Sequence, residues 1–318
     1  MSHEPRAEAW TTAPRTGSVE ANAMTDVPLD YGLPPAGYRL PDVARIGGVH
    51  LQVRDLERSV DYYTHVIGLR VVEQGLGTAA LAAHADGRPL VRLQERPGIA
   101  AVPTRGAFGL YHFALLLPDR TALGRFVTHL AAIGEHAGAA DHLVSEALYL
   151  NDPDGLGIEV YCDRPRDTWR HANRELAMAS DPLDFAAVAA AGRGEPWTGA
   201  PVGTTMGHIH LHVGDLDTAK RFFHRGLGFD VTVWSYPGAL FFAAGGYHHH
   251  LGTNTWAPGP SASDGEARLL DWELVLPSAE DAADAARSVA AAGFSAEQDG
   301  ASWTATDPWG TRLVLSTG

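Results

Sequence analysis

Apolar and polar positions recur in a fixed order along most of this chain. After about residue 40, a segment of alternating apolar residues is followed by one with apolar residues three and four apart, and then by short alternating segments. Alternation with a period of two is typical of strands, and a spacing of three to four is typical of an amphipathic helix. The pattern therefore predicts a unit of one strand, one helix and about three further strands.

The predicted unit is repeated. The segment GGVHLQVRDLERSVDYYTHVIGLRVVE aligns without a gap with GHIHLHVGDLDTAKRFFHRGLGFDVTV. In each copy an aspartate, Asp55 or Asp215, stands where it can cap the helix, and a glycine, Gly68 or Gly228, follows the helix. A looser repeat aligns YHFALLLPD with LDWELVLPS, and DPDG with DPWG. We predict four βαβββ modules, over residues 44–97, 108–163, 204–257 and 267–317.

The modules fall into two halves of the chain. We expect a first domain over 44–163 and a second over 204–317, each made of two modules. Residues 1–40 are rich in Ala, Pro, Gly and Thr without apolar periodicity, so we expect a flexible N-terminal tail that ends in a Pro-rich lead-in. Residues 164–203 form a linker in which we expect a short helix.

Two ionisable residues stand on otherwise apolar strands of the second module. His112 lies in GLYHFALLL and Glu159 lies in GLGIEVYC. Burial of a charged or polar side chain is costly unless a partner compensates it, and a divalent metal is one such partner. A structural histidine and an ion pair of Glu159 with Arg164 are the alternatives.

The distance to the start of the following helix shows which strand positions correspond. His112 lies seven residues before Asp119, and His208 lies seven residues before Asp215. The third module therefore offers a histidine in the register of His112. The coincidence of these two histidines with Glu159 favours a metal site over three separate structural roles.

The outer modules lack equivalent ligands. The register of His112 falls on Gly48 in the first module and on Asp271 in the fourth, and Val314 takes the place of Glu159. Pairing of the modules in chain order would separate His208 from the other two ligands. We therefore predict that modules two and three form one cup, which unites all three, and that modules one and four form the other.

Composition narrows the class of protein. The formal net charge of −14 over 318 residues argues against nucleic acid or an anionic membrane surface as the main partner. The apolar runs are shorter than a membrane span, and the first residues lack a secretory signal pattern. The single cysteine, Cys162, suits a reducing compartment. We expect a cytoplasmic protein.

The repeated unit, its DL-x5-FF/YY helix and its DPDG-x3-E ending resemble the vicinal oxygen chelate superfamily. This superfamily includes glyoxalase I, fosfomycin resistance proteins and type I extradiol dioxygenases. The resemblance implies an α+β fold in which modules pair into cupped, incompletely closed barrels whose strands present metal ligands inward.

Further residues resemble active-site residues of the extradiol dioxygenases in particular. The segment GGYHHHLG matches their acid-base histidine at His249. Tyr149, ten residues before Glu159, matches a tyrosine that hydrogen-bonds the substrate oxygen, and His142 matches another pocket histidine with a different spacing. The resemblance implies cleavage of a catechol-type diol by O2. Alternation lets only one of His248 and His249 point inward.

We expect the substrate to lie against aromatic and histidine side chains. His210 falls on the strand face of His208, although a structural role fits it equally well. The aromatic residues suit the ring of a catechol. The residues expected at this wall are Phe113, His210, Tyr236, Phe241, His248 and Trp256.

Two imidazoles and one carboxylate leave three coordination positions open, which suits Fe(II), and Mn(II) fits the same ligands. The expected partners are a catecholic substrate and O2. Edge strands and the linker each offer a contact surface for a homo-oligomer.

Two other functions remain open. A glyoxalase-like isomerase or hydrolase would use a fourth protein ligand, and a non-catalytic binding protein of the bleomycin-resistance kind would need no metal.

Overall fold

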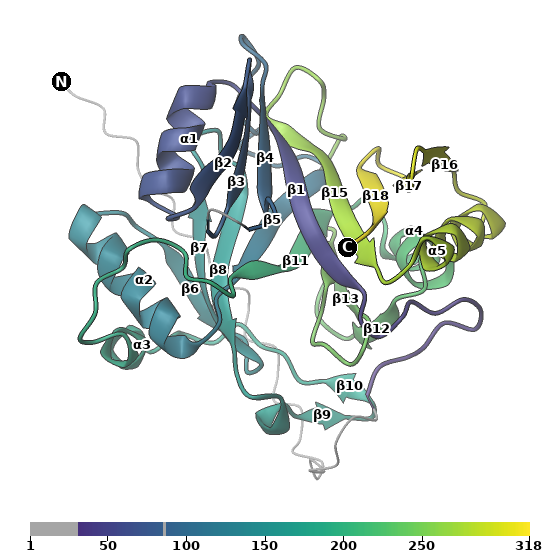
Figure 1. Ribbon diagram of the computed structural model, residues 1–318. Helices are drawn as coiled ribbons and strands as arrows, with labels where there is room; N and C mark the ends of the chain where they lie inside the picture. Colours follow the sequence, from purple (N-terminus) through teal and green to yellow (C-terminus); the bar gives the residue numbers. More distant parts are fainter. Residues whose placement is uncertain (1–30, 85–86) are drawn as a thin grey trace.

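The computed structural model describes residues 31–84 and 87–318. Two eight-stranded sheets make up its body, and the helices lie along their outer sides (Figure 1). Residues 1–30, the greater part of the predicted tail, lie outside the described residues. No helix in the described part is long and apolar enough to cross a bilayer.

The first sheet is built from the second and third modules, and we call it the inner-module sheet. Its strand order is β12-β13-β14-β11-β5-β8-β7-β6. The strands are β5 (Gly109–Leu116), β6 (Gly138–Asp141), β7 (Ser145–Asn151), β8 (Gly157–Asp163), β11 (Thr205–His212), β12 (Asp230–Val233), β13 (Ala239–Ala243) and β14 (Leu251–Asn254).

The second sheet is built from the first and fourth modules, and we call it the outer-module sheet. Its strand order is β16-β17-β18-β15-β1-β4-β3-β2. The strands are β1 (Arg45–Val53), β2 (Arg70–Gly75), β3 (Thr78–Ala82), β4 (Val91–Glu95), β15 (Arg268–Leu276), β16 (Ala296–Asp299), β17 (Ser302–Thr306) and β18 (Arg312–Thr317).

Each sheet is joined at its centre by the first strands of two modules. Strand β5 pairs antiparallel with β11, and β1 pairs antiparallel with β15. The predicted pairing of module two with three and of one with four is therefore confirmed. The α+β class is confirmed as well, since the four repeated units each add one helix to a sheet half.

The module helices begin at the capping residues that the sequence indicates. They are α1 (Leu56–His65), α2 (Arg120–Ile133), α4 (Leu216–Ala219), which continues as the π-helix η2 (Lys220–Gly226), and α5 (Ala279–Ala291). The side chains of Asp55, Asp119, Asp215 and Ser278 accept hydrogen bonds from N–H groups of the first turn. Such caps satisfy donors that the helix itself leaves free.

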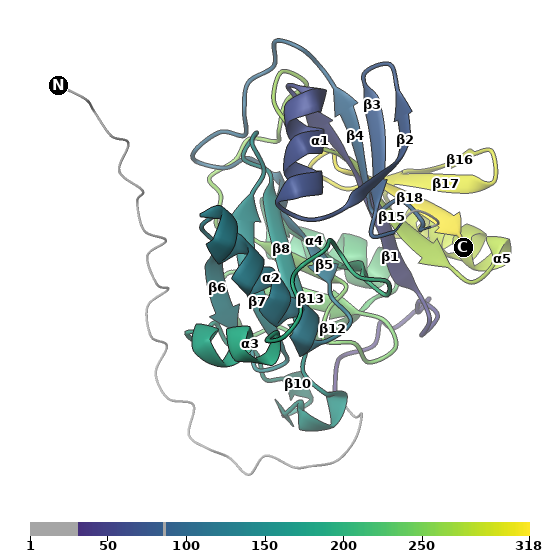
Figure 2. The same cartoon turned by 60° about the vertical axis from the view of Figure 1, so that its left-hand side comes forward.

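The segment between the two halves carries the short helix expected there. It contains η1 (Arg166–Thr168), β9 (His171–Ala172), β10 (Glu175–Leu176) and α3 (Phe185–Ala191). Helix α3 lies beside α2 (Figure 2). Two glycines allow this approach, because a Cβ at Gly124 would lie 2.3 Å from the carbonyl oxygen of Val188 and 2.5 Å from the backbone nitrogen of Gly192.

Residues 31–40, which the composition assigns to the flexible tail, instead pack on the third module. Leu33 forms a β-bridge with Val231. The Arg39 guanidinium pairs with Asp230, with an Nη2–Oδ2 distance of 2.6 Å. The composition predicts no such order, because the contacts depend on residues about 190 positions away.

The DPDG and DPWG turns before the last strands of modules two and four have the same internal hydrogen bonds. In each turn the first aspartate, Asp152 or Asp307, is buried, and its Oδ1 accepts from the N–H groups two and four residues later at 2.9 Å. Tyr63 also donates to Asp152 at 3.2 Å. These bonds fix the entry into β8, the strand that carries Glu159.

Replacement of Asp152 by asparagine tests this buried turn. Burial raises the pKa of Asp152 to about 7 in the folded protein, above the value of about 3.9 for an unfolded chain. The folded state therefore holds the proton more strongly, and this group's contribution to stability is present below pH ~4 and is lost as the pH rises toward 7. We expect the free energy of unfolding in urea, followed from pH 4 to 8, to decline less in Asp152→Asn than in the wild type. Equal declines in both proteins would contradict this account.

Candidate metal centre

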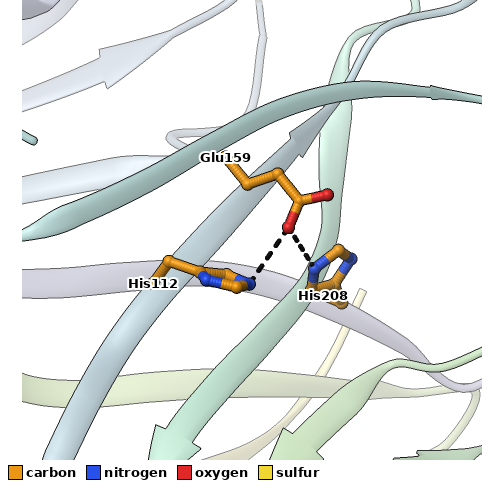
Figure 3. Close-up of side chains that lie close together, drawn as sticks. All are labelled: His112, Glu159 and His208. Carbon is orange, nitrogen blue, oxygen red and sulfur yellow. Dashed lines mark hydrogen bonds and ion pairs between the residues drawn. The ribbon is translucent and has the colours of Figure 1, made fainter. Parts of the chain in front are cut away.

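The two predicted histidines and the glutamate meet on one face of the inner-module sheet. They come from three neighbouring strands, His112 from β5, Glu159 from β8 and His208 from β11. Nε2 of His112 lies 3.0 Å from Oε2 of Glu159, and Nε2 of His208 lies 3.1 Å from the same oxygen. Figure 3 shows the three side chains pointing toward one another. Their ligand atoms all lie within 4.8 Å of one another.

A bulge in β11 helps to bring His208 to this point. The register with β5 shifts between Met206 and His208, which leaves Gly207 as the extra residue. A Cβ at Gly207 would lie 1.9 Å from the hydroxyl oxygen of Tyr161 on β8. A side chain at position 207 would therefore collide with the ring of Tyr161, and glycine avoids this.

The three residues hold the protonation states that metal ligands require. Burial lowers the pKa of His112 and of His208, which favours neutral imidazoles. Burial alone would raise the pKa of Glu159, but the contacts with His208 and His112 outweigh it and hold that pKa well below its usual range. Two neutral imidazoles therefore face one ionised carboxylate.

The contacts of these residues fit a divalent cation. The buried Nε2 of His112 lies 3.0 Å from Oε2 of Glu159 but meets no partner with the geometry of a hydrogen bond, so this nitrogen is available to a cation. The alternative ion pair of Glu159 with Arg164 is not formed, because Arg164 pairs with Asp141 at 2.6 Å and with Glu146 at 3.2 Å. Within the described ranges, the His112, Glu159 and His208 group is the one with metal-ligand spacing.

Tyr149 and His142 lie together beside the carboxylate of Glu159. Tyr149 on β7 pairs directly with Glu159 across the sheet. Nδ1 of His142 lies 2.6 Å from the carbonyl oxygen of Ala179, so this nitrogen carries the proton and Nε2 is the acceptor. The Tyr149 hydroxyl donates to that Nε2 over 2.5 Å. Burial raises the pKa of Tyr149 well above its usual value, so the hydroxyl stays protonated.

The structure separates the roles of the two neighbouring histidines. The ring of His249 lies 4.1 Å from that of His208, centroid to centroid, and 4.9 Å from that of Phe241. His248 is 0% exposed, and its Nδ1 and Nε2 contact His249 and Asp163. The structure does not support the expectation that His248 binds substrate, because both of its ring nitrogens already contact protein groups, His249 and Asp163.

His210 and Trp256 lie in an aromatic wall next to the ligands. The His210 ring lies 5.1 Å from that of His112, 5.7 Å from that of Trp256 and 5.2 Å from that of Tyr111. Trp256 is 46% exposed and marks the solvent side of this wall. Tyr236 lies 6.3 Å from Trp256, centroid to centroid.

Two residues of the wall differ from the sequence expectation. Phe113 does not belong to it, because residues alternate along β5 and His112 already faces the site. Its fully buried ring lies 6.4 Å from that of Tyr63 in the core under α1.

Tyr111 belongs to the wall, although the sequence did not predict it there. A register shift between His210 and Leu211 makes Tyr111 the unpaired residue of β5, and sequence alternation gives no signal for this bulge.

Two paired βαβββ modules with imidazole and carboxylate groups on one sheet face define a protein of the vicinal oxygen chelate class. Residues 45–160 and 205–315 match the Glyoxalase/Bleomycin resistance protein/Dioxygenase superfamily. The chain is 45% identical over 271 residues to a catechol-2,3-dioxygenase of Bacillus subtilis (strain 168), a match that covers 83% of this chain and 93% of the relative. The chain belongs to this superfamily.

Solved structures share the fold. The crystal structure of a dioxygenase from Bacillus subtilis subsp. subtilis str. 168 superposes with a TM-score of 0.61 at 13% identity. The match covers 88% of this chain and 86% of that chain. Glyoxalase I from Zea mays has a TM-score of 0.50 at 17% identity, with 86% and 92% covered. At these identities the likeness shows the arrangement of the modules and nothing about the reaction.

Removal of a ligand should abolish tight metal binding. We expect Glu159→Ala and His208→Ala to weaken binding of Fe(II) or Mn(II) by more than about 100-fold, because outer partners of metal ligands alone cost about 10–100-fold. Anaerobic isothermal titration calorimetry measures this. His50→Ala is the matched control, since His50 pairs with Asp271 at 3.1 Å in the outer-module sheet. Equal affinity in the wild type and Glu159→Ala would rule out this centre.

Proposed function

We propose that the protein is an Fe(II)-dependent extradiol dioxygenase that cleaves the ring of an uncharged catechol with O2. The observation that carries the proposal is the convergence of two imidazoles and one carboxylate beside His249 and Tyr149. The 45% identical relative, a catechol-2,3-dioxygenase, supports the same reaction class.

The metal would be held by His112, Glu159 and His208. Two histidines and one carboxylate with open positions are the ligand set of non-haem Fe(II) oxygenases, which is why we propose iron and treat manganese as the substitute. When bound, the metal supplies Lewis acidity and a path for electrons between the diol and O2.

His249 is the proposed acid-base residue. Burial lowers its pKa well below the usual value, so the resting imidazole is neutral and has a free lone pair. It accepts a proton from a catechol hydroxyl and later returns it as the ring opens, which leaves the residue unchanged after one turnover. Its ring contact with His208 places it next to the proposed ligands.

Tyr149 is the proposed orienting residue on the other side. Its hydroxyl stays protonated and donates to His142 in the structure. A substrate oxygen beside Glu159 would replace His142 as the acceptor of this proton, which fixes the direction of the diol. His142 would stay anchored beside the Tyr149 ring by its bond to the carbonyl of Ala179.

The aromatic wall favours a substrate without a charged substituent. The side chains placed there are histidine, tyrosine, phenylalanine and tryptophan, which carry no permanent positive charge. A buried unpaired charge is costly, so unsubstituted and alkyl catechols should be preferred over catechols that carry a carboxylate.

Oxygen uptake tests the proposal. Protein reconstituted anaerobically with Fe(II) should consume one O2 per diol with catechol or 4-methylcatechol and form a yellow ring-opened product. We expect kcat/KM to be at least about tenfold lower with 3,4-dihydroxybenzoate, since about 1.4 kcal/mol of charge penalty corresponds to a factor of ten. Glu159→Ala and His208→Ala should consume no O2.

Two outcomes would contradict the proposed function. Turnover of a substrate with Ni(II) or Zn(II) and without O2 would indicate a glyoxalase-like isomerase or hydrolase. Tight binding of a diol by the metal-free protein, with no turnover after iron is added, would indicate a binding protein.

A further inference from the structure

We propose that Asp163 and His248 are positioning residues for His249. The hydrogen-bond chain from Asp163 through His248 to His249 fixes the tautomer that leaves Nε2 of His249 free of a proton. This inference rests on the proposed function, because it assigns the orientation of the acid-base residue.

The hydrogen-bond chain consists of two short contacts that run from the partly exposed Asp163 to the buried His248 and His249. Nε2 of His248 lies 2.9 Å from Oδ1 of Asp163, and Nδ1 of His248 lies 2.7 Å from Nδ1 of His249. Asp163 ends β8, four residues after Glu159. The ring of His248 packs against that of Tyr247 at 4.0 Å, centroid to centroid, which holds its plane.

The proton positions follow from the Asp163 end of the hydrogen-bond chain. A carboxylate only accepts, so Nε2 of His248 carries a proton and donates it to Asp163. In the neutral imidazole Nδ1 of His248 is then an acceptor, and the proton between the two rings must belong to Nδ1 of His249. Nε2 of His249 therefore keeps its lone pair, as a base that acts through this atom requires.

The same hydrogen-bond chain also stabilises His249 in its protonated state. When His249 gains a proton at Nε2, its Nδ1–H remains bonded to His248, and the resulting positive charge is stabilised through His248 by the Asp163 carboxylate. No proton needs to leave Nδ1, so the proton returned to the product is the one accepted at Nε2. Charge and protons balance over the cycle.

A purely structural role for the His248 ring explains less of the geometry. The backbone of His248 is held separately, since the Thr232 hydroxyl donates to its carbonyl oxygen at 2.7 Å. The carboxylate of Asp163 also accepts from the Tyr247 hydroxyl at 3.1 Å. Tyr247 therefore provides a control, because its hydroxyl touches Asp163 but lies outside the chain to His249.

Asp163→Asn is the direct test, because it keeps the shape of the side chain and lets an amide face His248 in either orientation. In iron-loaded protein we expect kcat for catechol to fall about tenfold or more, with KM and iron content unchanged. Tyr247→Phe should stay within about twofold of the wild type. A merely structural loss would change KM or metal content and would affect both variants alike.

The tautomer itself gives a readout that does not depend on activity. In metal-free protein labelled with 15N-histidine, NMR should show His249 protonated at Nδ1 in the wild type and at least partly at Nε2 in Asp163→Asn. An unchanged tautomer, or a kcat of Asp163→Asn within twofold of the wild type, would overturn the inference. So would an equal fall in Tyr247→Phe.

If Asp163→Asn does not fold, a second pair of variants tests the positioning of His249. His248→Asn keeps an acceptor near the position of Nδ1, whereas His248→Gln keeps only a group near Nε2. We expect the asparagine variant to retain at least about fivefold more kcat, and equal values would overturn the inference. If the wild type itself consumes no O2 with any diol, the proposed function fails, and the NMR tautomer still tests the positioning.

Discussion

The antiparallel pairing of β5 with β11 is the constraint on which the rest of the site depends. These two strands start the second and third modules, and their contact is what places His208 against His112 and Glu159. Strand β8 joins β5 from the other side, so one central strand aligns ligands from both neighbours. The outer-module sheet repeats this architecture through β1 and β15, with His50 and Asp271 in an ordinary polar contact.

On both sides of the three ligands, a hydrogen-bond acceptor of the fold fixes the proton of a histidine, and that histidine in turn contacts a residue beside the ligands. On one side the carbonyl of Ala179 sets the proton of His142, which in turn accepts from Tyr149. On the other side Asp163 sets the proton of His248, which in turn faces His249. A fixed acceptor of the fold stands at the far end of each chain. The fold thereby decides which atoms next to the ligands donate and which accept, before any substrate arrives.

Much of this arrangement was predictable from the sequence because the repeat carries its own register. The seven-residue distance from His112 to Asp119 recurs from His208 to Asp215, and the helix caps confirm that these aspartates start the helices. A register counted from a cap identifies equivalent strand positions, and the absence of ligands at Gly48 and Val314 then selects the module pairing.

The sequence fails where local geometry departs from regular alternation. Phe113 was placed at the wall although its neighbour His112 already faced the site, and Tyr111 was missed because a bulge leaves it unpaired. The role of His248 depends on Asp163, which lies 85 residues away, so no local pattern reports their contact. Residues 31–40 show the same limit, since their partners lie in the third module.

The central claim is that one divalent metal joins the second and third modules through His112, Glu159 and His208. A crystal structure of the iron-loaded protein, with anomalous diffraction data collected on both sides of the iron absorption edge, tests it most directly. The account predicts a single strong iron peak between β5, β8 and β11, within about 2.2 Å of two imidazole nitrogens and one carboxylate oxygen. A peak at His248 to His250 or in the outer-module sheet, with none among these three residues, would contradict it.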